Sequence, residues 1–429
     1  MRPDIGAFLI AVFFISGASL SAFNIGWKII PIGFIVAAAV YIVGRKSINI
    51  ILSFAAILFV IFTAGSFYFH LRHSNPYFSS GSLVSGQAVI SSFPERRTGY
   101  QRFSAILAAP LKGSVDFMAP LYPSFRYGDL LEFSGKVEYG NSGKPIIAFP
   151  TIGRIKSGEG NFIVSRLFGI RERMTDIIMM SLPPSSSALA AGILLGDQSG
   201  FSKEMWDSFR DTGTTHIVAL SGFNIAVIAS VAGAAASVFS HRAKFLFPAT
   251  VIVLFVVMAG GEASAVRAAI MGTVILFGRD IGRPASMRNV IAFAAIIMVI
   301  WDPGVVVFDI GFELSFMAVI GIIYLAPLVR KVFGSGENKL NSFSNIVIDT
   351  ASAQAVVTPL LLMRFGFVSW YSLPVNLLVV GTVPLAMALS FAVAISGLFS
   401  KSLCLIAAIP ADIVLQYELK TISIFTDIF

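Results

Sequence analysis

A succession of long apolar segments is the feature that most constrains this chain. Such segments fill residues 5–69 and return from residue 215 to the end. Hydrophobic residues make up 56% of the chain and charged residues only 13%, whereas a soluble domain carries roughly a quarter charged residues. We therefore expect a polytopic membrane protein whose spans are α-helices, because lipid offers the backbone no hydrogen-bond partners.

Basic residues in the links indicate how these segments are oriented. They concentrate in alternate links, for example at Arg45 and Lys46 and from Arg279 to Arg288, and such links stay in the cytoplasm. This predicts a cytoplasmic N-terminus and an extracytoplasmic exit at residue 70. Pro374 and Pro384 can divide one span into two half-helices. The expected spans are Ile5–Phe23, Ile29–Val43, Ile48–Phe69, Thr215–Phe239, Phe245–Ala259, Ala263–Phe277, Asn289–Ile300, Val305–Val329, Ile346–Met363, Leu373–Phe399 and Ser402–Phe429.

Between the two apolar regions, residues 71–160 alternate apolar and polar side chains. The alternation is clearest at 82–90, 102–107 and 129–138 and predicts the strands of a small all-β, OB-like barrel. Its basic strands carry aromatic residues that could stack on single-stranded nucleic acid, namely Phe93, Tyr100, Phe103, Phe125 and Tyr127. The alternative, which the sequence alone favours, is a solvated β-domain with these aromatics in its core. The DNA-binding candidates are Arg96, Arg97, Arg102, Arg126 and Lys136.

Two amphipathic or interfacial helices are expected in 161–213, after the β-domain. Arg166–Ser181 has one apolar face, as in a helix that lies on a membrane surface, and Pro183–Pro184 ends it. Ala188–Leu195 is too short to span, and Ser202 is a plausible cap for the helix that follows. The fold is thus three transmembrane segments (1–70), the β-domain (71–160), these surface helices and a transmembrane core (214–429).

Polar residues within the apolar segments are the candidates for function, because they line cavities or pair with one another. In one continuous helix His216 and Asn224 would share a face, and we interpret 193–229 as the lining of a transport route. Arg267 could pair with Asp309 or Glu313, either as structural support or along the path. The channel or gate candidates are His216, Ser221, Gly222, Asn224, Arg267, Asp309, Glu313, Gln354 and Asn376.

No signature of an enzyme or of a metal site is present in the sequence. HExxH, Walker A and GxSxG patterns are absent, and the single cysteine, Cys404, excludes an internal disulfide. A Ser221–His216 pair would not be face to face on a helix, so an intramembrane hydrolase is the weakest hypothesis. We expect no catalytic residue, no metal and no cofactor.

Several motifs resemble the signature of the ComEC-type competence channel family. They are Gly196–Gly200 (GDQSG) and Phe209–Asn224 (FRDTGTTHIVALSGFN), followed in order by Val266–Ala268, Asp302–Pro303, Gly311–Phe316, Gln354, Pro359 and Asn376. The resemblance covers nearly the whole chain. Asn224 stands where the family usually has a second histidine, and we expect a short form without the C-terminal metallo-β-lactamase-like domain of many members.

The resemblance implies a channel of the bacterial inner (plasma) membrane that takes up single-stranded DNA in natural transformation. Its implied partners are single-stranded DNA, membrane lipid and a separate nuclease. A cytoplasmic ATP-driven motor or DNA-binding protein is also expected, because the sequence has no nucleotide-binding motif. The alternative is a transporter of a small molecule or lipid precursor on the same membrane core.

Overall fold

A computed structural model describes residues 3–22, 50–72, 78–97, 99–111, 113–139, 145–218, 220, 222–236, 241–280, 282, 286–333, 342–366, 369 and 371–428. The chain forms two compact units. One comprises residues 1–75, 141–143 and 270–316, and the other comprises 76–140, 144–269 and 317–429. Helices α10 (Ala263–Asp280) and α13 (Ile310–Ile320) run from one unit into the other.

The first unit is helical and held by close contacts between small residues. Its helices are α1 (Pro3–Ala22), α3 (Ile50–Arg72), α11 (Met287–Trp301) and α12 (Val305–Phe308). A Cβ at Gly17 would lie 1.9 Å from the Phe62 carbonyl oxygen, so α1 and α3 touch through their backbones. Ser66 Oγ donates to the Gly17 carbonyl at 2.7 Å across the same contact. Small residues allow this approach in membrane helices.

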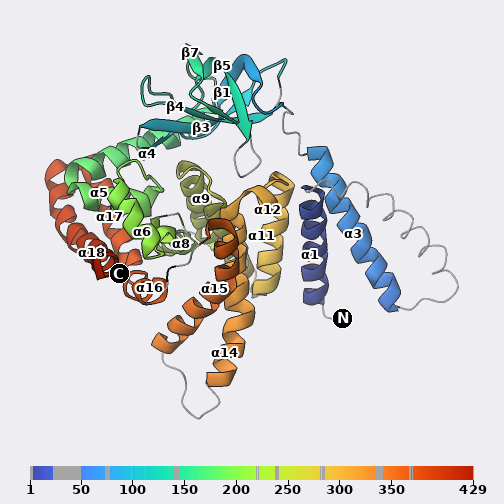
Figure 1. Cartoon of the computed structure of the whole chain (residues 1–429). Helices are drawn as coiled ribbons and strands as arrows, with labels where there is room; N and C mark the ends of the chain where they lie inside the picture. The colour runs from blue at the N-terminus through green and yellow to red at the C-terminus, as the bar shows by residue number, and fades with distance from the viewer. Residues whose placement is uncertain are drawn as a thin grey trace. The chain divides into compact units, whose positions relative to one another are not determined.

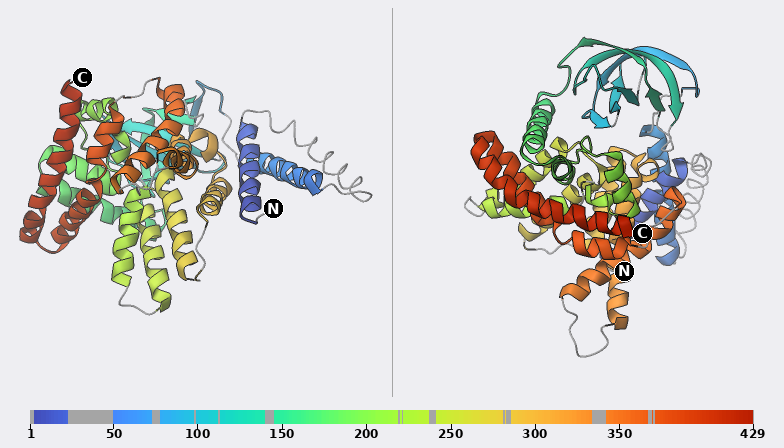
Figure 2. Two further views of the ribbon diagram at one scale, coloured as in Figure 1. Left: turned by 90° about the horizontal axis from the view of Figure 1, so that it is seen from below. Right: turned by 60° about the vertical axis from the view of Figure 1, so that its left-hand side comes forward.

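The second unit begins with a β-barrel. Five strands close a ring in the order β1-β3-β4-β6-β5, since β1 pairs with both β3 and β5. Figure 2 shows the curvature of this sheet. Neighbours in the ring are antiparallel except β4 and β6, which are parallel. The strands are β1 (Leu83–Ile90), β2 (Glu95–Arg97), β3 (Tyr100–Leu107), β4 (Ser114–Pro120), β5 (Leu130–Tyr139), β6 (Pro145–Ala148) and β7 (Thr151–Lys156). The three predicted strands correspond to β1, β3 and β5.

Aromatic side chains fill the barrel. Phe103, Phe117 and Phe133 are buried, because alternate residues of each strand point inward. Phe117 stacks on Phe103 and meets Phe133 edge to face. Phe125 packs against Phe103. Phe103 and Phe125 are therefore core residues, as the alternative interpretation of the barrel aromatics predicts.

The rest of the second unit is a helical bundle built around α5, of which residues 186–195 are all buried. Figure 1 shows α5 beside α4, α17 and α18, which all pack on it. A helix that is apolar all round belongs in a core. The helices are α4 (Phe162–Ser181), α5 (Pro184–Leu195), α6 (Lys203–Asp211), α7 (Thr215–Val218), α8 (Gly222–Ala236), α9 (His241–Met258), the π-helix η1 (Gly321–Leu325), α14 (Ala326–Phe333), α15 (Ser342–Phe365), α16 (Ser372–Val379), α17 (Val383–Phe399) and α18 (Lys401–Ile428).

Helix α4 begins earlier than the sequence predicts and packs on protein. Asn161 caps it, its Oδ1 accepting from the Ile163 amide at 2.9 Å. Met174 and Ile178 on its apolar face are buried, and the helix contacts α5, α9 and α17. The face expected to lie against lipid is therefore directed at other helices.

Among the residues that the structure describes, three helical stretches are long and apolar enough to cross a membrane: Ile310–Val332, Ser344–Arg364 and Lys401–Thr426. The pair α16 and α17 makes a fourth if the two helices count as one span, bent by 49°. The predicted division into two half-helices is thus confirmed, with the break next to Pro384, whereas Pro374 lies within α16. Shorter apolar helices match the other predicted spans among the described residues, and their crossing stays a prediction. Ile29–Val43 lies outside the described residues.

Two segments that we expected to be continuous spans are interrupted. Thr215–Phe239 divides into α7 and α8, because Leu220 is not helical. Val305–Val329 divides at Asp309, which has extended backbone (φ −110°, ψ 102°), and again at η1. A non-helical backbone at membrane depth is tolerated where protein buries it.

Candidate functional site

The segment that carries the strongest motifs folds as a junction of four short pieces. The end of α5, helix α7, the start of α8 and the start of α10 meet there. Asn224 Nδ2 donates to the Ile193 carbonyl at 2.9 Å, and the Ser264 hydroxyl donates to the Leu220 carbonyl. Gly196 ends α5 with φ +68°, and a Cβ there would lie 3.0 Å from Leu220 Cδ1. We call these contacts the entry junction.

The two polar residues expected on one helix face are separated in the structure. His216 is exposed on α7, with Nδ1 3.2 Å from the Gly213 carbonyl oxygen. Asn224 is 1% exposed on α8 and points at α5. The expectation of a shared face was wrong because the chain leaves the helical path between α7 and α8. Ser221 lies outside the described residues.

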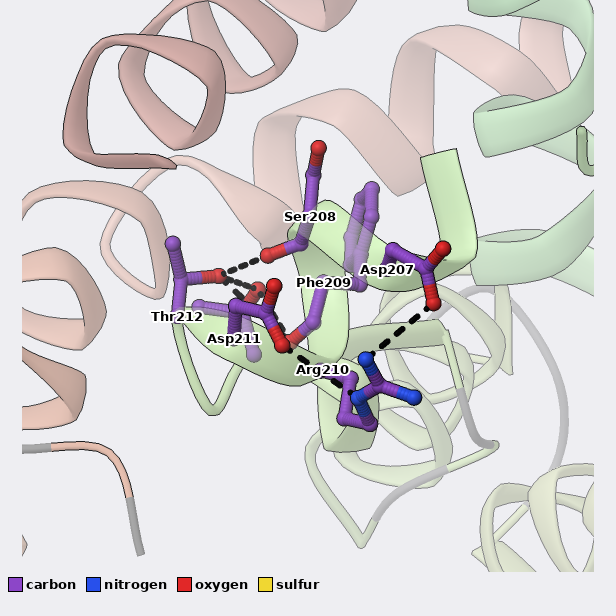
Figure 3. Close-up of polar contacts among 7 residues, drawn as sticks. Asp207, Ser208, Phe209, Arg210, Asp211 and Thr212 are labelled. Carbon is purple, nitrogen blue, oxygen red and sulfur yellow. Dashed lines mark hydrogen bonds and ion pairs between the residues drawn. The ribbon is translucent and has the colours of Figure 1, made fainter. Parts of the chain in front are cut away.

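Helix α6 leads into this junction and satisfies its own polar groups (Figure 3). Ser202 caps its start, as predicted, by accepting from the Met205 amide. At its end the Thr212 hydroxyl donates to the Ser208 carbonyl at 2.7 Å. Arg210 lies 3.2 Å from both Asp207 and Asp211. The charge of Arg210 is thus balanced locally, which makes it a poor candidate for a phosphate contact.

Arg267 lies at the entry junction, whereas its two predicted partners belong to the other unit. Its side chain is 7% exposed, and its Nη2 would be 3.7 Å from a Cβ at Gly222. Asp309 Oδ1 accepts from the Phe312 amide at 2.9 Å and so caps α13, while Glu313 lies in the first turn of that helix. A pairing of Arg267 with either carboxylate stays a prediction.

The last two gate candidates lie on later helices. Gln354 is half-buried on α15, and its carbonyl accepts from Thr358. Asn376 is 4% exposed on α16, where Nδ2 donates to Ser372 Oγ at 3.2 Å. Neither residue reaches the entry junction through a contact that the described residues show.

Sequence reasoning missed two carboxyl groups on α18 that contact other helices, of which Glu418 is buried and Asp412 is half-buried. Ser186 Oγ on α5 donates to Asp412 and accepts from Gln416 Nε2 at 2.9 Å. Glu418 is fully buried and contacts Thr382, in the break between α16 and α17. Carboxyl groups in an apolar segment that could span a membrane are themselves a signal of function, and both stand in the predicted span Ser402–Phe429.

A buried arginine joins the barrel to the helices. Arg171 of α4 is 3% exposed, and its guanidinium lies 4.2 Å from the centre of the Phe93 ring of the barrel. Burial lowers the pKa of Arg171, while the negative charges of Asp197, Glu95 and Glu262 act in the opposite direction. Phe168, one turn earlier, packs against Phe93 and Tyr127. We call these contacts the barrel joint.

The five DNA-binding candidates on the barrel fall into two groups. Arg97 pairs with Glu95 at 3.2 Å and Arg102 with Asp116 at 2.8 Å. Arg96, Arg126 and Lys136 are exposed and form no ion pair within the part of the chain that the structure describes. These three are the cations most available to a polyanion.

Two exposed aromatic residues were missed by the sequence analysis. Tyr122, which follows β4, is 85% exposed, and Phe149, which follows β6, is 59% exposed. Because β4 and β6 are parallel, both side chains leave the same end of the barrel. Phe149 has φ +47°, a conformation that costs a side chain energy and that persists at functional sites.

Comparison with known proteins gives two matches. The model of the competence protein family matches residues 193–428, which include the entry junction and the carboxyl groups of Asp412 and Glu418 on α18. ComE operon protein 3 of Bacillus subtilis (strain 168) is 24% identical over 220 residues, which cover 50% of this chain and 27% of that protein. The chain thus matches about a quarter of that relative's length. No solved structure matches.

Proposed function

The chain belongs to the competence protein family, and on this premise we propose that it takes part in DNA uptake during natural transformation. The match over residues 193–428 is the observation that carries this proposal. The apolar helices support a place in the membrane, and we propose the bacterial inner (plasma) membrane. The finer role we propose is that of a channel for single-stranded DNA.

We propose that the barrel is an OB-like domain outside the cytoplasm that presents the strand to the channel. The closed ring of five strands supports the first part of this proposal. Arg96, Arg126 and Lys136 would contact phosphates, and Tyr122 and Phe149 would stack on bases. Translocation of a polyanion would draw on an ATP-driven cytoplasmic partner, and a separate nuclease would supply single strands.

Binding of an oligonucleotide to the full chain in lipid nanodiscs tests the proposal. We expect affinity for single-stranded DNA to fall as salt rises, with log K declining by about 0.7 per phosphate contact for each unit of log salt. Replacing Arg96, Arg126 or Lys136 by Gln should reduce this slope. Lys156→Gln is the matched control, because Lys156 is exposed but already paired with Glu159. Salt-independent or absent binding would contradict a DNA-presenting barrel.

The alternative function, transport of a small molecule or lipid precursor, rests on the broken helix α16–α17, since broken helices form substrate sites in transporters. A deletion strain separates the two functions. Loss of DNA uptake supports the channel, whereas uptake and integration at the parental rate would exclude it and favour the transporter.

A further inference from the structure

A buried carboxyl group meets the break between α16 and α17. Thr382 lies in this break, and Glu418 of α18 contacts it with Oε1 2.8 Å from the Thr382 hydroxyl oxygen. The Glu418 side chain is 0% exposed. Its other oxygen, Oε2, has no hydrogen-bond partner among the described residues. A carboxylate charge in this position would be poorly stabilised.

The hydrogen bonds of Thr382 indicate where a proton is held. Its hydroxyl oxygen is 2.8 Å from the Val379 carbonyl oxygen and 2.8 Å from Glu418 Oε1. The carbonyl can only accept, and a hydroxyl group has a single proton to donate. Both contacts are hydrogen bonds if Glu418 keeps its proton and donates it to Thr382, which in turn donates to Val379.

Within the part of the chain that the structure describes, no counter-charge faces Glu418 from the helices that pack on α18. Helices α5, α16 and α17 carry no charged side chain at all. On α6, Lys203 and Arg210 are exposed, and Arg210 pairs with two aspartates. On α4 the buried Arg171 belongs to the barrel joint. The remaining titratable groups of these helices are Arg166, Glu172, Arg173 and Asp176 on α4, Glu204 on α6, and Lys401, Cys404, Asp412, Tyr417, Lys420 and Asp427 on α18.

We propose that Glu418 is a proton-binding site of the membrane core, neutral while the α16–α17 break is docked on α18, and that loss of this proton opens the contact. An ionised carboxylate would need water or a cation that the docked helices do not offer. The single proton of the Thr382 hydroxyl could then bond only one of its two acceptors, Glu418 or Val379. With one of these bonds lost, the two half-helices could move apart from α18. Such breaks are where transporters bind their coupling ions. Protonation of the site does not depend on the proposed role in DNA uptake, whereas the coupling of proton exchange to transport rests on that role.

Infrared spectra of the full chain in lipid nanodiscs, recorded at neutral pH and subtracted between parent and variant, test the protonation state. We expect a carboxylic-acid C=O band at neutral pH that is absent from Glu418→Gln and present in the matched control Asp412→Asn. A Glu418→Gln spectrum identical to that of the parent would show an ionised carboxylate and overturn the proposal.

A second measurement tests whether proton exchange is used. Glu418→Gln imitates the neutral group permanently, so we expect it to melt at the parental temperature yet lose transport, measured as DNA uptake. Glu418→Asp can exchange a proton and should retain transport. Parental uptake by Glu418→Gln would overturn the coupling role, whereas loss of uptake in both variants would point to a need for the exact side chain and overturn it as well.

Discussion

At the scale of single residues, the entry junction is held by hydrogen bonds to backbone carbonyls. Asn224 bonds Ile193 and Ser264 bonds Leu220, and both acceptors lie where a helix ends or is interrupted. The carbonyls near a helix end lack partners within the helix. An amide at position 224 supplies its N–H donor at every pH. A given histidine nitrogen donates only in the cationic ring or in one of the two neutral tautomers. The junction of this chain is therefore independent of protonation at residue 224.

Replacing Asn224 tests how much this bond contributes. Asn224→Ala leaves a buried carbonyl without its partner and should lower the free energy of unfolding by about 1–3 kcal/mol. Asn224→Asp should destabilise at least as much, since a carboxylate cannot donate to Ile193. Thermal unfolding of the full chain measures both. Ser230→Ala on the same helix is the control, because its hydroxyl is exposed and bonds only Ala226; an equal loss there would refute the assignment.

We expect the Phe149 side chain to lower the stability of the barrel and to raise its affinity for single-stranded DNA. Phe149→Gly removes both the ring and the strain of a side chain at φ +47°, so we expect stability to rise by up to about 1 kcal/mol. Phe149→Ala removes the ring but keeps a Cβ, so its stability should not rise. Both variants should bind single-stranded DNA about fivefold or more weakly, since a stacked base contributes about 1–3 kcal/mol.

An abasic oligonucleotide of the same length separates stacking from charge. The parent chain should bind it more weakly than the oligonucleotide with bases, and Phe149→Ala should discriminate less between the two. Equal affinity of the parent for both would contradict stacking while leaving phosphate binding intact.

At the scale of elements, α4 connects the barrel to the helical bundle. One part of the helix, around Phe168 and Arg171, contacts the barrel, and another, around Ile178, is buried in the bundle. A cation over an aromatic ring is attracted more strongly when water is excluded. The barrel joint thus combines the aromatic contacts of Phe168 with one buried cation, Arg171, which Phe93 covers.

Replacing Arg171 should loosen the barrel from the bundle without unfolding either. Arg171→Met keeps the apolar stem but removes the cation, so Glu95, Asp197 and Glu262 lose a compensating charge. We expect faster amide hydrogen exchange at 90–97 and 257–262, and parental exchange in the barrel core. Arg173→Met, on the exposed side of the same helix, is the control. Parental exchange in Arg171→Met would show that the charge does not hold the joint.

The sequence predicts regular elements here better than it predicts contacts. Alternation located β1, β3 and β5, and the cap at Ser202 and the break near Pro384 are local signals that the structure confirms. The split between α7 and α8 was missed because its cause is tertiary: α5 and α10 supply bonds that replace helical ones. Burial of Glu418 and exposure of Tyr122 and Phe149 also depend on residues distant in sequence, which periodicity does not reveal.

At the scale of the whole molecule, the proposed role requires the barrel and the basic links to lie on opposite sides of the membrane. The chain is suited to cysteine labelling, since its single cysteine, Cys404, is buried and can be replaced by Ala. In that background Ser85→Cys marks an exposed position of β1, and Lys401→Cys marks the exposed start of α18. The positive-inside rule puts Lys401 in the cytoplasm.

A membrane-impermeant maleimide applied to intact cells, with the outer membrane opened where there is one, should label the cysteine at position 85. It should reach position 401 only after the inner membrane is permeabilised. The reverse pattern would place the barrel in the cytoplasm, where it could receive a strand but not present one for uptake. Labelling at both positions in intact cells would mean that Lys401 is not on the cytoplasmic side, and the assignment of the last spans would then be wrong. Only the first pattern places the exposed cations of the barrel on the side of the membrane from which DNA arrives, where they can bind it before translocation.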